Sequence, residues 1–138
     1  MSLVPEELEQ LNFERYEKYN YIKENEAMYE EYLMDDAEYA IAAFGIASRV
    51  AKNAVNEARK QGIKVGMIRP ITLWPFPVAP FKKAADKVKA IISVELSMGQ
   101  MIEDVRLATE CKVPVTLCNR VGGMIVSPEQ VLGAMKEV

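Results

Sequence analysis

The chain has 138 residues, close to the usual size of one domain, with 27% charged residues and a formal charge of -3. That charge provides no attraction for phosphate backbones, so neither nucleic acid nor an anionic membrane is an expected partner. No apolar run approaches the roughly 18 residues of a membrane span, and no secretory signal is present. We therefore expect a cytoplasmic protein.

The chemistry available to the side chains is limited. Histidine is absent, which removes the commonest general base and the commonest transition-metal ligand. The two cysteines, Cys111 and Cys118, are too few for structural zinc or an iron–sulfur cluster, and we expect both to be buried and reduced. An enzyme made of this chain alone would have to rely on carboxylates, lysines or a cofactor.

The first part of the chain, residues 1–36, is predicted to be a helical arm or linker. It is rich in Glu and Tyr, and its apolar residues recur at helical spacing, which predicts one long or two shorter helices with weak points at Asn20 and Asn25. All six tyrosines precede residue 40, and such amphipathic side chains are common at interfaces. The arm packs either on its own domain or on a neighbour. We expect it to cause self-association, giving a homo-oligomer.

Residues 37–138 are predicted to form one α/β domain with a mainly parallel sheet. Short apolar runs alternate with amphipathic segments, and a strand-helix-strand unit implies parallel strands with a right-handed crossover. Gly62 is expected to end the first of these helices, and Ser127 and Gln130 to cap the last. The predicted strands are 38–44, 63–68, 90–94 and 113–118, and the helices following them are 47–61, 78–87, 98–108 and 128–138.

The segment from Arg69 to Pro80, RPITLWPFPVAP, contains four prolines, which exclude a regular helix or a central strand. We expect an ordered, extended loop. Its large rings, Trp74 and Phe76, either cap the core of this domain or insert into a neighbour. The sequence leaves both possibilities open.

Loops at the carboxyl ends of parallel strands are the usual place for ligands and partners. Glu95, Ser97, Gly99 and Gln100 follow the buried strand 90–94 and are the first candidates, although a solvated loop is an equal alternative. No dinucleotide-binding or phosphate-loop glycine motif is present, and the adjacent carboxylates of residues 103 and 104 point in different directions on a helix.

A second candidate loop is Asn119-Arg120-Val121-Gly122-Gly123. Its paired glycines could bring the backbone close to a partner or form an anion-binding nest. A tight turn before a capped helix explains them equally well. We name Arg120, Gly122 and Gly123 as interface candidates only.

Three separated segments give the chain a recognisable resemblance. They are DAEYAIAAFGIASRVAKNAVNEARKQGIKVGMIRPITLWPFP, SVELSMGQMIEDVRLA and NRVGGMIVSPEQVL. Together they resemble the C-terminal part of the alpha subunit of 2-oxoacid:ferredoxin oxidoreductases over residues 29–138. The form MGQMIEDVRLA is more similar to the 2-oxoisovalerate (branched-chain) type than to the 2-oxoglutarate type. Asn119 departs from the glycine more often found there, which weakens the case for close backbone approach at that position.

The resemblance implies a three-layer α/β/α sandwich similar to the transketolase C-terminal domain. It further implies an enzyme that uses thiamine diphosphate, coenzyme A and a ferredoxin acceptor to convert a 2-oxoacid into an acyl-CoA. The implied partners are the pyrimidine-binding domain that precedes this one, a thiamine-binding beta subunit and ferredoxin. The residues that perform the chemistry are not in this chain, so we expect an inactive C-terminal fragment without catalytic, cofactor or metal residues, whose first few residues are foreign to the subunit.

Two functional hypotheses follow. In the first, the chain is an assembly domain whose loops at residues 69–76, 95–100 and 120–123 face other domains or subunits. In the second, it is an independent α/β domain that binds a small ligand on the same face. Binding of thiamine diphosphate or coenzyme A by the isolated chain would separate them.

Overall fold

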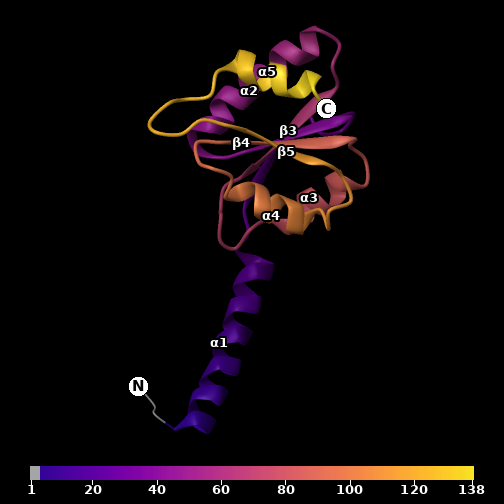
Figure 1. Cartoon of the computed structure of the whole chain (residues 1–138). Coiled ribbons are helices and arrows are strands. Elements are labelled where there is room, and N and C mark those ends of the chain that lie inside the picture. The colour runs from indigo at the N-terminus through magenta and orange to yellow at the C-terminus, as the bar shows by residue number, and fades with distance from the viewer. Residues whose placement is uncertain (1–3) are drawn as a thin grey trace.

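A computed structural model describes residues 4–138, so the prediction that the first few residues are foreign falls partly or wholly outside the described residues. The helices and strands follow the alternation read from the sequence, with one additional strand (Figure 1). The helices are α1 (Pro5–Asn25), α2 (Gly45–Lys60), α3 (Val78–Ala85), α4 (Met101–Ala108) and α5 (Pro128–Lys136). The strands are β1 (Tyr29–Tyr32), β2 (Tyr39–Ala43), β3 (Val65–Pro70), β4 (Ala90–Glu95) and β5 (Val115–Asn119).

The five strands form one sheet in the order β1-β3-β2-β4-β5. Strands β2, β3, β4 and β5 are parallel, as the strand-helix-strand pattern predicts, and only β1 is antiparallel. Helices α2 and α5 cover one face of the sheet, and α3 and α4 cover the other (Figure 1). The structure is the three-layer α/β/α sandwich that the resemblance implied.

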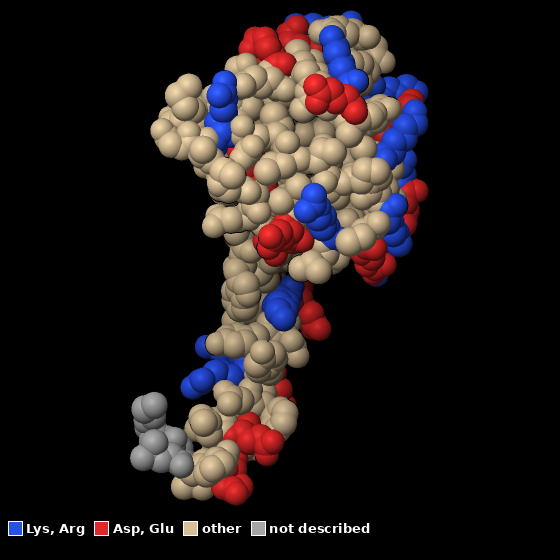
Figure 2. Space-filling view, viewed as in Figure 1, with Lys and Arg blue, Asp and Glu red and all other residues tan. Residues whose placement is uncertain are grey.

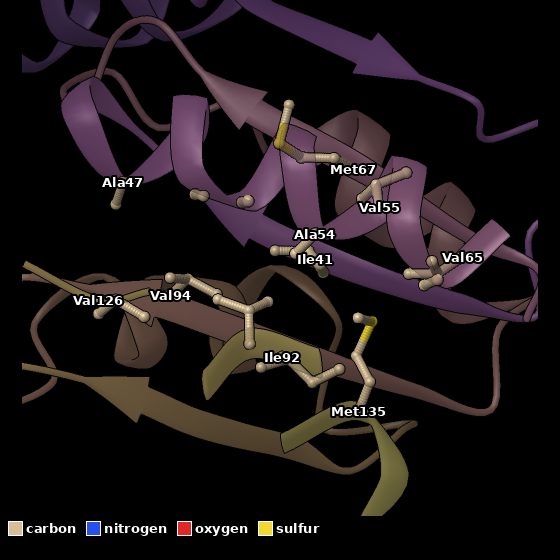
Figure 3. Packing of buried hydrophobic residues seen from close by; sticks show 14 residues of the cluster. Ile41, Ala47, Ala54, Val55, Val65, Met67, Ile92, Val94, Val126 and Met135 are labelled. Carbon is tan, nitrogen blue, oxygen red and sulfur yellow. The ribbon is translucent and has the colours of Figure 1, made fainter. Parts of the chain in front are cut away.

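Each face of the sheet has its own apolar core, because successive residues of a strand point to opposite sides. In β2, Ile41 and Ala43 face α2 and α5, whereas Ala40 and Ala42 face α3 and α4. Figure 3 shows the first of these clusters, where side chains of α2 and α5 meet those of the central strands. The labelled residues there are Ile41, Ala47, Ala54, Val55, Val65, Met67, Ile92, Val94, Val126 and Met135.

Strand β1 corrects the prediction of a helix up to residue 34. Helix α1 ends at Asn25, one of the two expected weak points, whose side-chain amide donates to the Tyr21 carbonyl at 2.8 Å. Tyr29–Tyr32 then pair antiparallel with β3, and Met28 exchanges hydrogen bonds with the segment that follows β3. The structure therefore places residues 29–32, which the predicted division assigns to the arm, in the sheet. Four residues, Tyr-Glu-Glu-Tyr, are too few to show a strand or a helix period, so only the pairing with β3 decides.

Helix α1 projects away from the sandwich (Figure 1). None of its residues is buried, so it adds nothing to either core. An edge-to-face contact between the rings of Tyr19 and Trp74 joins it to the domain. Neither α1 nor any other helix within residues 4–138 is long and apolar enough to cross a membrane.

Three further local predictions are wrong. Arg69 and Pro70 belong to the end of β3 rather than to a loop. Pro80 lies in the first turn of α3, where a missing N–H costs nothing, as the helix predicted from residue 78 requires. Helix α4 begins at Met101, and Met98 stands outside it with 79% of its surface exposed. Cys111 is exposed, because it lies in the turn after α4 rather than beneath it.

Replacing Gly133 with Ala is expected to raise the free energy of unfolding by about 0.5–1 kcal/mol, because glycine is a poor former of helix interiors. Gly133 lies within α5, is exposed, and has no atom within 4 Å of the position that a Cβ would take. Urea denaturation of both forms measures the difference. A destabilised variant would contradict the geometry of α5.

Candidate functional site

The candidate residues from the loops all lie at the end of the sheet where the parallel strands have their carboxyl ends, which we call the edge of the sheet. Because β2, β3, β4 and β5 are parallel, their carboxyl ends meet at this edge, and the segments 69–76, 95–100 and 120–123 leave from it. The loop of residues 120–127, at the left in Figure 1, is part of it. The structure thus brings the candidates to the same edge, but it gives them different environments. We describe them in turn.

Glu95 is the last residue of β4 and is fully buried. It points to the face covered by α4, as do Ile91 and Ser93, because these residues alternate along the strand. One carboxylate oxygen of Glu95, Oε2, accepts from the Ser97 hydroxyl at 2.8 Å and from two backbone amides of the turn entering α4, at 2.9 and 3.0 Å. The other oxygen, Oε1, accepts from the Ser93 hydroxyl and from the Ile102 amide, both at 2.8 Å.

This network makes Glu95 the cap of α4. Burial by itself would raise the pKa of Glu95, but the hydrogen bonds from the two serines and the amides outweigh burial and hold the pKa below its usual range. The positive end of the helix dipole acts in the same direction. The carboxylate is therefore charged, satisfied and turned inward, so it does not itself contact a partner at the surface.

A neighbouring carboxylate behaves in the opposite way. Burial raises the pKa of Asp104, and the negative charges of Glu103 and Glu95 raise it further. No cation pairs with Asp104 among the described residues. The first turn of α4 therefore holds carboxylates at the edge of the sheet without forming an acid and base pair.

The loops after β4 and β5 are joined to each other. The Asn119 side-chain amide donates to the Ser97 carbonyl at 2.6 Å, and the Arg120 amide donates to the Glu95 carbonyl at 3.2 Å. Gly99 has a φ of 98°, a conformation that favours glycine, and a Cβ there would lie 3.0 Å from the end of the Leu117 side chain, which would have to shift slightly. Asn119 thus fixes the loop of residues 95–100 instead of approaching a partner with its backbone.

Arg120, Gly122 and Gly123 lie in the exposed loop that follows. The Arg120 side chain approaches Gln130 of α5, with 3.4 Å between Nε and Oε1, and both glycines adopt positive φ with open space around them. Gln100 is also exposed, and its amide donates to Glu95. These residues remain interface candidates on position alone.

The two large rings of the proline-rich segment, Phe76 and Trp74, lie in different environments. Phe76 is partly buried and stacks on Phe81 of α3 with 5.2 Å between ring centroids, which caps the core. Trp74 is 57% exposed and contacts Tyr19 of α1 edge to face at 5.6 Å. Phe76 therefore caps the core, the first of the two possibilities left open by the sequence, whereas insertion of Trp74 into a neighbour stays a prediction.

Arg69 lies on the opposite side of β3 from Ile68 and faces β1. It is paired across the strands with Glu30, and its Nη1 lies 3.0 Å from a Glu30 carboxylate oxygen. Its Nε is buried without an acceptor. Arg69 therefore holds the antiparallel edge strand in place.

Sequence reasoning missed an apolar surface at the same edge, which we call the edge patch. Its members are large apolar side chains that are exposed around the strand ends, either in the first turn of α2 (Ile46) or in loops (Leu96, Met98, Val121, Met124 and Ile125). Figure 2 shows that the loop projecting at the left is mainly uncharged. Apolar residues at turn positions, where polar ones are usual, were the available signal. Exposed apolar clusters of this kind mark protein–protein contacts more often than sites for charged ligands.

The described residues offer little reactive chemistry. They contain no group of three or more His, Cys, Asp or Glu side chains placed to hold a metal ion. Burial raises the pKa of the Cys118 thiol, which makes it a poor nucleophile.

The sheet order and the two helical layers define a transketolase-like α/β domain. A solved structure of a split-gene transketolase has the same fold, with a TM-score of 0.68 over 78% of this chain and 40% of that one at 17% sequence identity. The chain itself belongs to the family of the pyruvate:ferredoxin oxidoreductase core domain II, whose model matches residues 37–131. The family resemblance read from the three sequence segments is confirmed.

Two relatives show how the domain is used elsewhere. The ketoisovalerate oxidoreductase subunit VorB of Methanothermobacter thermautotrophicus is 52% identical over 133 residues, which is 96% of this chain and 38% of that subunit. The 2-oxoglutarate:ferredoxin oxidoreductase of Magnetococcus marinus, solved with 2-oxoglutarate, coenzyme A and succinyl-CoA bound, superposes with a TM-score of 0.84. That match has 25% identity and covers 99% of this chain and 24% of that one. The chain thus spans well under half of either relative.

Proposed function

We propose that the chain is an assembly domain of the alpha subunit of a thiamine diphosphate-dependent 2-oxoacid:ferredoxin oxidoreductase, in the cytoplasm. The observation that supports this most is the 52% identity to VorB over 133 residues. The substrate of the complete enzyme is proposed to be 2-oxoisovalerate, which agrees with the name of that relative. The product would be the corresponding acyl-CoA, with ferredoxin as the electron acceptor.

The residues of this chain do not fit the iron–sulfur clusters or the thiamine diphosphate of such an enzyme. A four-thiolate iron–sulfur cluster needs more cysteines than the two in the sequence. A diphosphate is usually held through a divalent cation with carboxylate ligands, and the described residues bring no three such groups together. We therefore assign thiamine diphosphate and the clusters to other parts of the complex, and derive no catalytic step here.

The role left to this chain is to present its sheet edge to the pyrimidine-binding domain of the same subunit or to the thiamine-binding beta subunit. Glu95 makes that edge rigid, because its network fixes the start of α4. The edge patch gives it an apolar surface. The rival function, an independent domain for a small ligand, would use the same edge as a pocket.

A domain exchange tests the proposal. Substituting this chain for the matching 133 residues of VorB is expected to give an enzyme that assembles and oxidises 2-oxoisovalerate with coenzyme A and methyl viologen. The isolated chain is expected to be folded and inactive in the same assay. A soluble exchanged subunit that fails to assemble would contradict the proposal. Micromolar binding of coenzyme A or thiamine diphosphate to the isolated chain, measured by calorimetry, would favour the rival.

A further inference from the structure

We propose that α1 and the proline-rich loop together form a docking surface for an apolar protein surface bordered by carboxylates. We call it the arm groove and define it by Tyr16, Tyr19 and Lys23 of α1 with Trp74 and Phe76 of the loop. The inference rests on the proposed function in one respect, the source of the partner. We assign the partner surface to the part of the subunit outside this chain. The edge patch is a separate surface.

The arm groove is continuous because its aromatic rings contact one another. Tyr16 and Tyr19 lie edge to face with 5.9 Å between centroids, and Tyr19 contacts Trp74 in the same way at 5.6 Å. Beyond Trp74 the surface is hollowed, with a volume of about 780 Å3 lined by Lys23, Phe76 and other residues of the loop. Aromatic side chains around a concavity are the usual anchors of a protein interface.

The apolar residues of α1 extend the groove along the arm. At about 100° per residue, the side chains of Leu8, Leu11, Tyr19 and Ile22 fall within about 80° of one another. Ile22 is partly buried and Tyr19 touches Trp74, so this stripe is on the side that meets the loop. Leu8 and Leu11 are exposed farther along the same stripe. A partner seated on the loop would therefore also cover the arm.

The charges beside the stripe are mostly positive. By the same helical geometry, Arg15 falls within it, Lys18, Lys23 and Glu7 flank it, and Glu17 lies on the opposite side of α1. The hollow beyond Trp74 is lined by Glu24 as well as Lys23, so Arg15, Lys18 and Lys23 face the two carboxylates of Glu7 and Glu24 along this surface. None of the three cations forms an ion pair among the described residues. Electrostatic complementarity thus calls for a partner with carboxylates around an apolar centre.

A second copy of this chain is a poor occupant for the same reason. Two arms packed through this stripe would bring Arg15 and Lys18 of one copy toward the equivalent cations of the other, and like charges at an interface are unfavourable. We expected self-association from the tyrosines in the sequence, without regard to where these cations lie on the helix. The experiment must therefore distinguish self-association from binding of the proposed partner.

The arm needs a partner on physical grounds. Most of the stability of a helix in a protein comes from packing of its apolar face, and α1 has no buried residue to stabilise it. The match to the Magnetococcus marinus enzyme covers 99% of this chain, the arm included, and only 24% of that longer chain. The residues of the arm are therefore matched within a protein that carries far more polypeptide, which is why we assign the partner to the rest of the subunit.

Trp74 is the only tryptophan, so its fluorescence reports directly on the arm groove. The probe is a synthetic amphipathic helix of Leu and Glu, compared with the same helix carrying Lys in place of Glu. We expect saturable changes in Trp74 emission with the acidic peptide and binding at least tenfold weaker with the basic one. Tyr19→Ala should weaken binding of the acidic peptide about tenfold, as loss of an interface aromatic does. Lys23→Glu should reduce the preference for the acidic peptide.

Tyr21→Ala is the matched control, since Tyr21 is on the same helix, is 64% exposed and points away from the stripe. It should bind like the unmodified chain. Equal affinity for the two peptides, or no binding of the acidic one, would overturn the proposal. So would a dimer in sedimentation equilibrium that Tyr19→Ala dissociates, because the occupant would then be a second copy. The assay contains no 2-oxoacid or cofactor, so its failure would leave the proposed function untouched.

Discussion

Replacing Glu95 with Gln is expected to lower the free energy of unfolding by about 3 kcal/mol at pH 7, and the melting temperature by roughly 10 °C. The carboxylate accepts five hydrogen bonds, three of them from backbone amides at the start of α4. An amide group has one acceptor oxygen, so its nitrogen would face a donor such as the Ile102 N–H in a site without water. Thermal and urea denaturation of the two forms measure the loss.

The pH dependence of stability provides a second readout for Glu95. Its pKa is lower in the folded state than the ordinary value of about 4.3 that applies when the chain is unfolded. The unfolded state therefore binds more protons in this range, and the stabilisation is complete above the ordinary value and is lost as pH falls through the folded pKa. The difference in stability between the native chain and Glu95→Gln should shrink correspondingly in acid.

Glu103→Gln is the control for this experiment. Glu103 is also in the first turn of α4, but it is exposed. Its replacement should change stability by no more than about 0.5 kcal/mol through the helix dipole. A Glu95→Gln variant as stable as Glu103→Gln would show that the buried network contributes little.

Replacing Gly66 with Ala is expected to destabilise the protein by about 2–3 kcal/mol. Gly66 lies in the middle of β3, and an added Cβ would stand 2.6 Å from the Leu33 carbonyl oxygen and 2.5 Å from the Met34 sulfur. The methionine could move, but the Leu33 carbonyl is backbone and is held at 2.7 Å by the guanidinium of Arg59. The substitution should therefore push the segment between β1 and β2 away from the sheet.

The free energy of unfolding from urea titration tests this prediction, with Gly133→Ala as the matched control in a place without crowding. The same chemical change is thus expected to destabilise at one glycine and stabilise at the other. If Gly66→Ala were within about 0.5 kcal/mol of the native chain, the connection around Leu33 would have to be more adaptable than packed interiors usually are. In that case Arg59→Ala should also change the free energy of unfolding little, since the guanidinium would not be holding the Leu33 carbonyl in a fixed position.

Much of the sandwich could be predicted from the sequence because its signals are local. The capping box of Ser127 and Gln130 is present at the start of α5, as expected. The uninterrupted apolar run in β4 indicates a strand covered on both faces, and it is buried at every position. Even the direction of Glu95 followed in principle from its alternation with Ile91 and Ser93.

Other features depended on partners distant in sequence. Strand β1 forms because it pairs with the outer side of β3. Neither the residue types of the short Tyr and Glu segment nor their spacing indicates that pairing. Glu95 was predicted to be a site residue, but its carboxylate accepts hydrogen bonds from backbone amides five to seven positions later in the chain. Only the folded turn brings these amides to the carboxylate.

The candidate surfaces divide in the same way. Trp74 and Phe76 were visible in the sequence as large rings on a rigid loop, yet only packing placed one in the core and left the other beside α1. The apolar loops of the edge patch become one edge only when parallel strands bring their carboxyl ends together. The sequence by itself thus determined the order of the elements and the family, through local periodicity and motifs. The tertiary structure alone decided which side chains are satisfied inside the domain and which are left for a partner, because burial and hydrogen bonding depend on contacts between distant segments.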